Sequence, residues 1–447
     1  MKNHSKKTGN QQPQHAPGPI YPYFIRRQGA GPPALNRTSS QPFRVLTLLI
    51  FNLALLILLF ACPGPPEETI CGQGMILQND TCTCIPNAHP SEDGESCECD
   101  TLYHWNDDLE ECILDTTTYN IDWVFDTLGI YPSWINDVSI ISQNDIWAVG
   151  KITYPDPDSS WNGTGKESFN AAHWDGDEWS YHHLDAVDAW GNVSAFGEIY
   201  SIFSFSENNI WMFTSRGSYI HYDGHEWTTE YVPERRGSIK SIWGSSQDNL
   251  YFVGRNGNIT HYDGNRFTLI ESGTDIHLLS VGGSLDAQYV MCVGIDSDGS
   301  IALQLTNGDV RTIFDNSSSN YSETSGYKAV GLWDHIAYIA TFHGLLTYDF
   351  ETGDTTWVNL NDLINNFLYI WKIDVYAPND IFIAGDGGHM LHYNGQHWTY
   401  DASVKTAFSN NGYSANVRNL DVKDNVVVMA GSAFGGEHAF IARGDKQ

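Results

Sequence analysis

The sequence predicts an all-β protein: a seven-bladed β-propeller of four-stranded antiparallel blades, preceded by an N-terminal membrane anchor and a small disulfide-rich module. Three observations lead to this prediction. Two short phrases recur together along residues 118–447, six cysteines are crowded into residues 71–112, and a long uncharged run follows a basic tail. Repeat units of about 40 to 50 residues that are rich in short strands are typical of propellers.

The repeated phrases define the blades. One phrase occurs as HWDGDEW, HYDGHEW, HYDGNRF and HYNGQHW, and a second phrase, such as NDIWAVG or DNLYFVG, precedes each copy. Weaker copies bring the number of units to seven, and each unit is interpreted as four strands. Asp263-Gly264 predicts a type I′ hairpin turn between strands. The second strand is apolar on both faces, which suits a blade packed between two neighbours.

The last unit indicates how the ring closes. It reaches the C-terminus without a fourth strand, whereas NIDWVFDTL at 120–128 precedes the first unit, with Trp123 where Trp227 stands in an ordinary fourth strand. A strand from the N-terminal side that completes the last blade removes the open edges of a linear array. The HYDG phrase is interpreted as structural. The alternative, a ligand site in each blade, is disfavoured because units four, five and seven lack it.

A family resemblance follows from these phrases. SIWGSSQDNLYFVG and ITHYDGNRF resemble the propeller repeats found in many secreted bacterial lipoproteins, over about 330 residues. The resemblance implies the propeller fold. It implies no particular activity, because propellers serve as enzymes, receptors and scaffolds alike.

The N-terminal region predicts a membrane anchor. Residues 1–44 hold seven basic and no acidic residues, as a cytoplasmic tail or an extended signal n-region, and VLTLLIFNLALLILLFAC follows at 45–62. The end of this run resembles a bacterial lipobox, with Ala61 before a lipidated Cys62. An uncleaved single span is the alternative. Both interpretations place the rest of the chain outside the cytoplasm, facing the periplasm or the exterior at a bacterial outer membrane or cell surface.

The cysteine-rich segment predicts disulfides. It follows a Pro-rich linker at 63–70, and it is too short and polar to be held by burial alone. The segment resembles an EGF-like module, although CTC and CEC give two close pairs where that family has one. Zinc is the alternative, but it prefers C-x2-4-C spacing and a reducing compartment. Six cysteines allow about 15 pairings. The predicted disulfide cysteines are Cys71, Cys82, Cys84, Cys97, Cys99 and Cys112.

The charge excludes one class of partner. The chain carries a net charge of −31, and all of its acidic residues lie beyond the basic tail. Because the acidic part of the chain is repelled by phosphate backbones, we expect no nucleic-acid partner.

Catalytic patterns are absent from the sequence. It contains no H-E-x-x-H, G-x-S-x-G or P-loop, and we predict no catalytic residue, metal or cofactor. Asp296 and Asp298 before Gly299 resemble a fragment of a calcium loop but are interpreted as a turn. Cys292 is interpreted as a buried strand thiol rather than a nucleophile.

Three long excursions, 153–170, 185–197 and 315–326, are expected on one face of the propeller. This face is predicted to bind a protein or glycan ligand. The alternative is that its aromatic residues only pin their own loops. The predicted ligand-binding residues are Trp161, Trp190, Phe196, Asp156 and Asp158.

The leading prediction is therefore a non-catalytic surface lipoprotein. The alternative is a carbohydrate-active hydrolase with its site in the central channel. Converging carboxylates at the channel mouth would favour the hydrolase, because glycosidases need two of them at a fixed separation. Aromatic residues without converging acids would favour the binding protein.

Overall fold

The repeats fold as antiparallel blades in the computed structural model of the chain. The structure describes residues 73–78, 81–91, 93–107, 109–118, 120–156, 165–194, 197–306, 308–316, 326–363, 369–409, 415–433 and 435–447. The predicted tail, membrane segment, Cys62, linker and Cys71 lie outside these ranges. Within them, no helix has the length and apolar character needed to cross a membrane.

Seven four-stranded antiparallel sheets form the blades. In each blade, the first strand named is the innermost one and the fourth is the outermost one. Blade 1 comprises β8 (Ile130–Ser142), β9 (Asp145–Pro155), β10 (Lys166–Trp174) and β11 (Trp179–His182). Blade 2 comprises β14 (Ile199–Ser206), β15 (Asn209–Thr214), β16 (Ser218–Tyr222) and β17 (Trp227–Tyr231). Blade 3 comprises β18 (Ile239–Ser246), β19 (Asn249–Gly254), β20 (Asn258–Tyr262) and β21 (Phe267–Ile270). Blade 4 comprises β22 (Leu278–Gly283), β23 (Val290–Asp296), β24 (Gly299–Thr306) and β25 (Asp309–Asp315).

The remaining blades continue the same pattern. Blade 5 comprises β26 (Ala329–Trp333), β27 (Ile336–Ala340), β28 (Gly344–Asp349) and β29 (Thr355–Asn359). Blade 6 comprises β30 (Ile370–Ala377), β31 (Asp380–Gly385), β32 (His389–Tyr393) and β33 (Trp398–Asp401). Blade 7 comprises β34 (Asn416–Lys423), β35 (Val426–Ala433), β36 (His438–Lys446) and β7 (Ile121–Leu128). Short elements lie between blades: the hairpin β12 (Ala186–Val187) and β13 (Val193–Ser194), the 3-10 turn η1 (Asn361–Leu363), and α2 (Ser403–Phe408). A second 3-10 turn, η2 (Asp386–Gly388), joins β31 to β32 within blade 6.

The first strands of the blades close a ring. Each first strand contacts the first strand of the next blade, and β34 of blade 7 contacts β8 of blade 1. The predicted fold class, a seven-bladed propeller of four-stranded antiparallel blades, is therefore confirmed.

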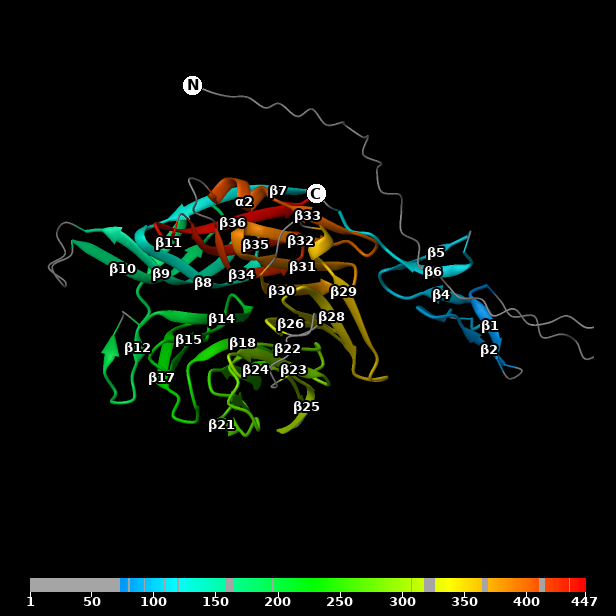
Figure 1. Cartoon of the computed structure of the whole chain (residues 1–447), viewed down its shortest axis with the longest axis horizontal. Helices are drawn as coiled ribbons and strands as arrows, with labels where there is room; N and C mark the ends of the chain where they lie inside the picture. Colours follow the sequence, from blue (N-terminus) through cyan, green and yellow to red (C-terminus); the bar gives the residue numbers. More distant parts are fainter. Residues whose placement is uncertain are drawn as a thin grey trace, which may run out of the picture. The chain divides into compact units, whose positions relative to one another are not determined.

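The ring is sealed by a strand from the N-terminal side of the domain. Figure 1 shows β7 (cyan) beside β36 (red), and eight residue pairs join them, from Ala439 opposite Leu128 to Lys446 opposite Ile121. Trp123 lies opposite Gly444, as Trp227 lies opposite Tyr222 in blade 2. Pairing the two ends of the domain covers the outer edge of β36, so blade 7 has four strands like the other blades.

The core lies between blades. The second strands are buried on both faces, as the sequence predicts: in β19, Leu250, Phe252 and Val253 are fully buried and Tyr251 nearly so. Phe252 packs with Trp211 and Phe213 of blade 2 in one apolar cluster. Because such clusters join neighbouring blades, the apolar side chains on both faces of each second strand stabilise the ring rather than a single sheet.

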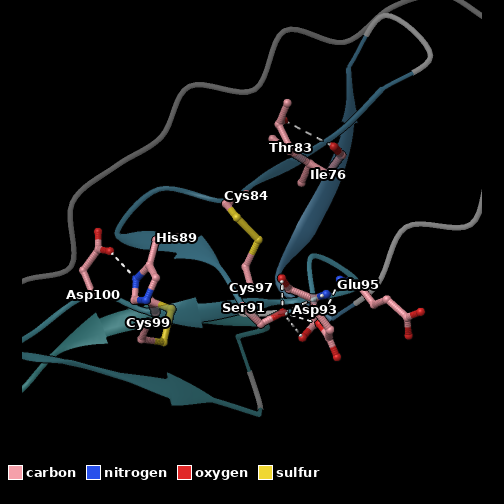
Figure 2. The surroundings of a disulfide bond; sticks show 12 residues. Ile76, Thr83, Cys84, His89, Ser91, Asp93, Glu95, Cys97, Cys99 and Asp100 are labelled. Atoms are coloured by element: carbon pink, nitrogen blue, oxygen red, sulfur yellow. Dashed lines mark hydrogen bonds and ion pairs between the residues drawn. A yellow bond between two sulfur atoms is a disulfide. The ribbon is translucent and has the colours of Figure 1, made fainter.

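The cysteine-rich module consists of three short hairpins. They are β1 (Met75–Gln78) with β2 (Thr81–Cys84), β3 (Ala88–Pro90) with β4 (Cys97–Cys99), and β5 (Tyr103–Asn106) with β6 (Glu111–Leu114). Disulfides join Cys84 to Cys97 and Cys99 to Cys112, and Cys82 is also disulfide-bonded. Figure 2 shows the first bridge beside the Ser91–Asp93 turn. With few buried side chains in this segment, the bridges are its main constraint.

The segment that follows the module is hydrogen-bonded to blade 6. The Thr117 hydroxyl donates to the Asn379 carbonyl (2.9 Å), and the Thr117 N–H donates to the Asn394 carbonyl (3.1 Å). The Asn379 side chain in turn donates to the Asp115 carbonyl (3.0 Å). These bonds fix the path of the chain before it enters β7.

Candidate binding site at the channel mouth

The HYDG phrase serves the blade itself. Its histidine Nε2 reaches the Asn or Asp that opens the second strand: His173 to Asp145 at 2.8 Å, His221 to Asn209 at 3.0 Å, His261 to Asn249 at 2.7 Å and His392 to Asp380 at 2.7 Å. Each imidazole also packs on the aromatic two residues after that Asn or Asp, with ring centroids 4.1–4.6 Å apart. The two repeated phrases are therefore two halves of one structural network.

The Asp-Gly pair forms a different turn from the one predicted. The Asp263 carboxylate accepts the N–H groups of Asn265 and Arg266, and Gly264 has φ +86° while Asp263 does not have positive φ. The loop thus spans four residues between β20 and β21, because the Asp side chain caps it. The turn with two positive φ values, as type I′ requires, is Asn256-Gly257 between β19 and β20.

A β-bulge recurs at the start of the innermost strand. In six blades the pairing between first and second strands skips one residue there, and blade 5 alone has regular pairing. Bulges re-aim side chains at the rims of barrels and beside binding sites. With the corresponding residue of blade 5, the re-aimed residues form what we call the mouth ring: Asn136, Tyr200, Lys240, Leu279, Lys328, Trp371 and Arg418.

The mouth ring surrounds a cavity of about 480 Å³ at the end of the central channel where the first strands begin. The channel continues behind it, lined by first-strand residues of all seven blades. This end faces the same way as the long excursions, because the links between blades arrive at the start of each first strand. The predicted face and the cavity are therefore on one side of the propeller.

Two lysines of the mouth ring lie over aromatic neighbours. The Lys240 Nζ is 4.5 Å from the centre of the Tyr200 ring, and the Lys328 Nζ is 4.3 Å from that of Trp371. Burial lowers the pKa of both lysines. Cation–π contact holds such amines in place while the protein withdraws them from water.

Arg418 completes the cationic side of the mouth. Its guanidinium lies 5.4 Å from the centre of the Trp134 ring and donates to the Asn136 amide oxygen (2.7 Å). Asn136 and the Trp134 indole both donate to Glu198, at 2.8 and 2.7 Å. Glu198 is therefore occupied in positioning its neighbours.

Carboxylates act on the mouth cations only at longer range among the described residues: Glu198 on Lys240 and Arg418, and Asp386 on Lys328. In the described part of the chain, no Asp or Glu oxygen lies within 4.0 Å of the charged nitrogens of Lys240, Lys328 or Arg418. Elsewhere in the described part of the chain, some cations are ion-paired and others are not. The paired ones are Arg216, Arg236, Arg266, Arg443 and Lys446.

Acidic side chains occur deeper in the channel, where they join blades. Asp137 accepts the Ile202 N–H (2.9 Å), Asp421 accepts the Ile140 N–H (2.6 Å) and Asp374 accepts the Val422 N–H (2.7 Å). Burial raises the pKa of Asp137 to about 6, while burial and the neighbouring Asp374 raise that of Asp421 to about 7. Each carboxylate ties a first strand to the next one around the ring.

The structure places only part of the ligand site predicted from sequence. Trp161, Asp158 and Phe196 lie outside the described residues, as do 317–325 of the third excursion. Asp156 follows β9, and its N–H donates to the Gly165 carbonyl (2.9 Å). The first excursion is shorter than predicted, because β9 runs to Pro155 and β10 begins at Lys166.

Trp190 is described and stands clear of its own loop. It is 86% exposed at the tip of the β12–β13 hairpin. The Asp188 carboxylate accepts the N–H groups of Trp190 and Asn192 (both 2.9 Å) and pairs with Arg216 (3.3 Å). The loop is therefore braced by Asp188, which leaves the indole available for contact.

Two other candidates from the sequence have structural roles here. Asp296 accepts the N–H groups of Asp298 (2.8 Å) and His277 (2.9 Å), so it caps a turn and a strand start. Cys292 is fully buried, and burial raises the pKa of its thiol, which makes it a poor nucleophile.

Comparison with known proteins gives a likeness of fold. No family model and no curated protein matches the chain. Among solved structures, "YCF48 bound to D1 peptide" matches with a TM-score of 0.53 at 17% identity, over 74% of this chain and 98% of that one. YCF48 from Cyanidioschyzon merolae matches with 0.49 at 14% identity, over 71% and 98%. The WD40 β-propeller domain of Doa1 matches with 0.47 at 12% identity, over 74% and 97%.

Proposed function

We propose that the chain is a non-catalytic binding protein whose protein ligand docks on the propeller face that carries the channel mouth. The observation that supports this most is the mouth ring. One backbone position, repeated around seven blades, presents a different side chain in almost every blade. A surface built on a repeated scaffold but varied in chemistry suits recognition of one particular partner.

The distribution of acids favours binding over sugar hydrolysis. Glycosidases need two carboxylates placed on either side of the scissile bond. Around the mouth cavity, Glu198 is held by Trp134 and Asn136, and Asp137 accepts a backbone N–H of the next blade. Aromatic and cationic side chains make up most of the remaining lining.

The mouth aromatics favour a protein ligand over a glycan. Sugar stacking needs an open aromatic face, whereas Tyr200, Trp371 and Trp134 each have a cation over the ring. A propeller of similar fold has been solved with a bound peptide, as YCF48 was with the D1 peptide. That likeness supports the use of such a fold for peptide binding.

We also propose that the protein is anchored outside the cytoplasm. The proposal rests on the basic tail, the apolar run and the lipobox-like Cys62, with a single uncleaved span as the other form of anchor. The disulfides Cys84–Cys97 and Cys99–Cys112 support an oxidising compartment. The intact mass of the membrane-extracted protein distinguishes a chain that begins at lipidated Cys62 from one that retains residues 1–61.

Site-directed photocrosslinking tests the docking face. A benzophenone amino acid replaces Tyr200 at the mouth, and in a matched control it replaces Tyr289, a half-buried tyrosine on the opposite face. In cells that make the full chain, we expect a discrete protein adduct from position 200 and none from position 289. Adducts only from position 289, or from neither position, would contradict the proposal.

A further inference from the structure

We infer that the mouth ring binds the carboxylate groups of a short acidic peptide segment of the partner protein. This inference rests on the proposed function and specifies the chemistry of the same site. Lys240, Lys328 and Arg418 are the residues that receive the carboxylates.

The first argument is charge complementarity. Four cations, Lys240, Lys328, Lys372 and Arg418, line one cavity together with two carboxylates, Asp137 and Glu198. In the described part of the chain, none of the four cations has an Asp or Glu oxygen within 4.0 Å of its charged nitrogens. By contrast, the buried ammonium of Lys446 is directly paired with Asp380. A ligand carboxylate would make the direct contact with these cations that Glu198 and Asp386 do not make.

The second argument is preorganisation. Lys240 and Lys328 are half-buried and held over Tyr200 and Trp371, so their amines are placed before any ligand arrives. Arg418 is held by the Asn136 amide oxygen. Binding an anion to groups that are already ordered and partly desolvated loses little conformational entropy.

The third argument concerns the class of anion. Asp137, Asp374 and Asp421 line the channel behind the mouth, together with the cations Lys372 and Lys423. This acidic interior repels polyanions such as nucleic acid or sulfated glycan but tolerates single carboxylates held at the rim. The covered aromatic faces also disfavour sugar stacking.

The fourth argument is size. A cavity of about 480 Å³ holds a few side chains, and Leu279 and Trp371 add apolar surface to its lining. The matching ligand is therefore a segment of a few residues that alternates acidic with apolar side chains, or that ends in a free carboxyl group.

Fluorescence anisotropy with the full chain in detergent tests the inference. The probe is a labelled peptide amide that alternates glutamate with leucine, and the matched probe has glutamine in place of glutamate. A third probe is the glutamine peptide with a free C-terminal carboxyl group, which separates side-chain from terminal carboxylates. We expect the glutamate peptide or the free-acid peptide to bind, more weakly as salt rises, and the glutamine amide not to bind.

Variants locate the binding. Removing Lys240, Lys328 and Arg418 together as K240Q/K328Q/R418Q should weaken binding by at least about tenfold per cation. The control K423Q/R266Q removes two cations on the opposite side and should bind like the wild type. K240R/K328R keeps the charge and should retain binding.

The outcomes are distinguishable from those of the crosslinking test. Equal affinity for glutamate and glutamine amides with no binding of the free acid, unchanged affinity in K240Q/K328Q/R418Q, or tighter binding of a sulfated oligosaccharide would each overturn the inference. If position 200 still captures a protein partner in those cases, the proposed function stands and only the carboxylate chemistry is wrong.

Discussion

The second and third strands of the blades differ from the innermost strands in what is repeated from blade to blade. In the second and third strands, blades 1, 2, 3 and 6 repeat the same side chains. A histidine of the third strand stacks on an aromatic ring of the second strand and contacts the Asn or Asp that opens the second strand. In the innermost strands the backbone bulge repeats, but the side chain it re-aims changes from blade to blade. Repeated side chains hold the scaffold together, whereas a repeated position with varied side chains builds a surface.

This contrast corrects a natural misinterpretation of the sequence. The most conspicuous phrase, HYDG, invites a functional interpretation, yet its histidine Nε2 and the side-chain oxygen of its Asp or Asn are hydrogen-bonded inside each blade that carries it. The mouth ring is inconspicuous because its residues share no type. We therefore expect substitutions in the HYDG network to change stability and substitutions in the mouth ring to change binding.

The largest expected effect is on stability, from Asp380→Ala in the blade 6 copy of the network. Asp380 pairs with both His392 (2.7 Å) and Lys446 (2.5 Å), and all three side chains are buried. Removing the carboxylate leaves the Lys446 ammonium buried without its counter-charge, which costs about 3–5 kcal/mol. Chemical denaturation measures the free energy of unfolding.

Asp145→Ala is the matched control, because Asp145 occupies the same position in blade 1 and pairs with His173 but with no lysine. We expect a loss of about 1 kcal/mol there. Equal losses in the two variants would show that the buried lysine contributes nothing to the difference.

A smaller effect is expected from pH, through the carboxylates that join the first strands. The pKa of Asp421 is raised to about 7 and that of Asp137 to about 6, so between about pH 4 and pH 7 the folded state binds protons that the unfolded state has lost. Stability from these groups is therefore present at low pH and declines as the pH rises through this window. Each contributes about 1 kcal/mol once solvent in the channel is allowed for.

Asp421→Asn isolates this contribution. The amide oxygen can still accept the Ile140 N–H, but the side chain no longer titrates. We expect the thermal midpoint of the variant to fall less than that of the wild type between about pH 5 and pH 8. A steeper fall in the variant would show that Asp421 is ionised in the folded state across this range.

The smallest effect on stability is expected from Trp190→Ala. Because the indole is 86% exposed, its loss should change the free energy of unfolding by less than about 0.5 kcal/mol. We nevertheless expect weaker capture of the protein partner by the full chain, since an exposed tryptophan on a braced hairpin is a typical interface anchor. Undiminished capture would remove this hairpin from the docking surface.

Much of the fold could be predicted from the sequence because turn residues and buried aromatics repeat along the chain. The seven units, the two-sided burial of β19 and the position of Trp123 all followed from aligning the phrases. The type of turn at Asp263 could not be predicted, because an Asp-Gly pair occurs both in two-residue hairpin turns and in longer turns that the Asp side chain caps.

The candidate site was harder to predict. The mouth ring depends on β-bulges, which leave no residue signature of their own. One signal was present: a buried apolar residue, such as Ile135, Ile199 or Ile239, immediately precedes each ring residue. In an alignment of the seven repeats, a position of varied residue type that directly follows a consistently apolar position would have marked the mouth ring. The predicted aromatics of the excursions could be judged only at Trp190.

The most direct test of the central claim is the affinity of the acidic peptide for one variant of each region, at a temperature where both are folded. The account predicts that D145A, altered in the repeated network, binds like the wild type, while K240Q/K328Q/R418Q, altered in the mouth ring, loses binding. Loss of affinity in D145A with unchanged affinity in the mouth variant would contradict it.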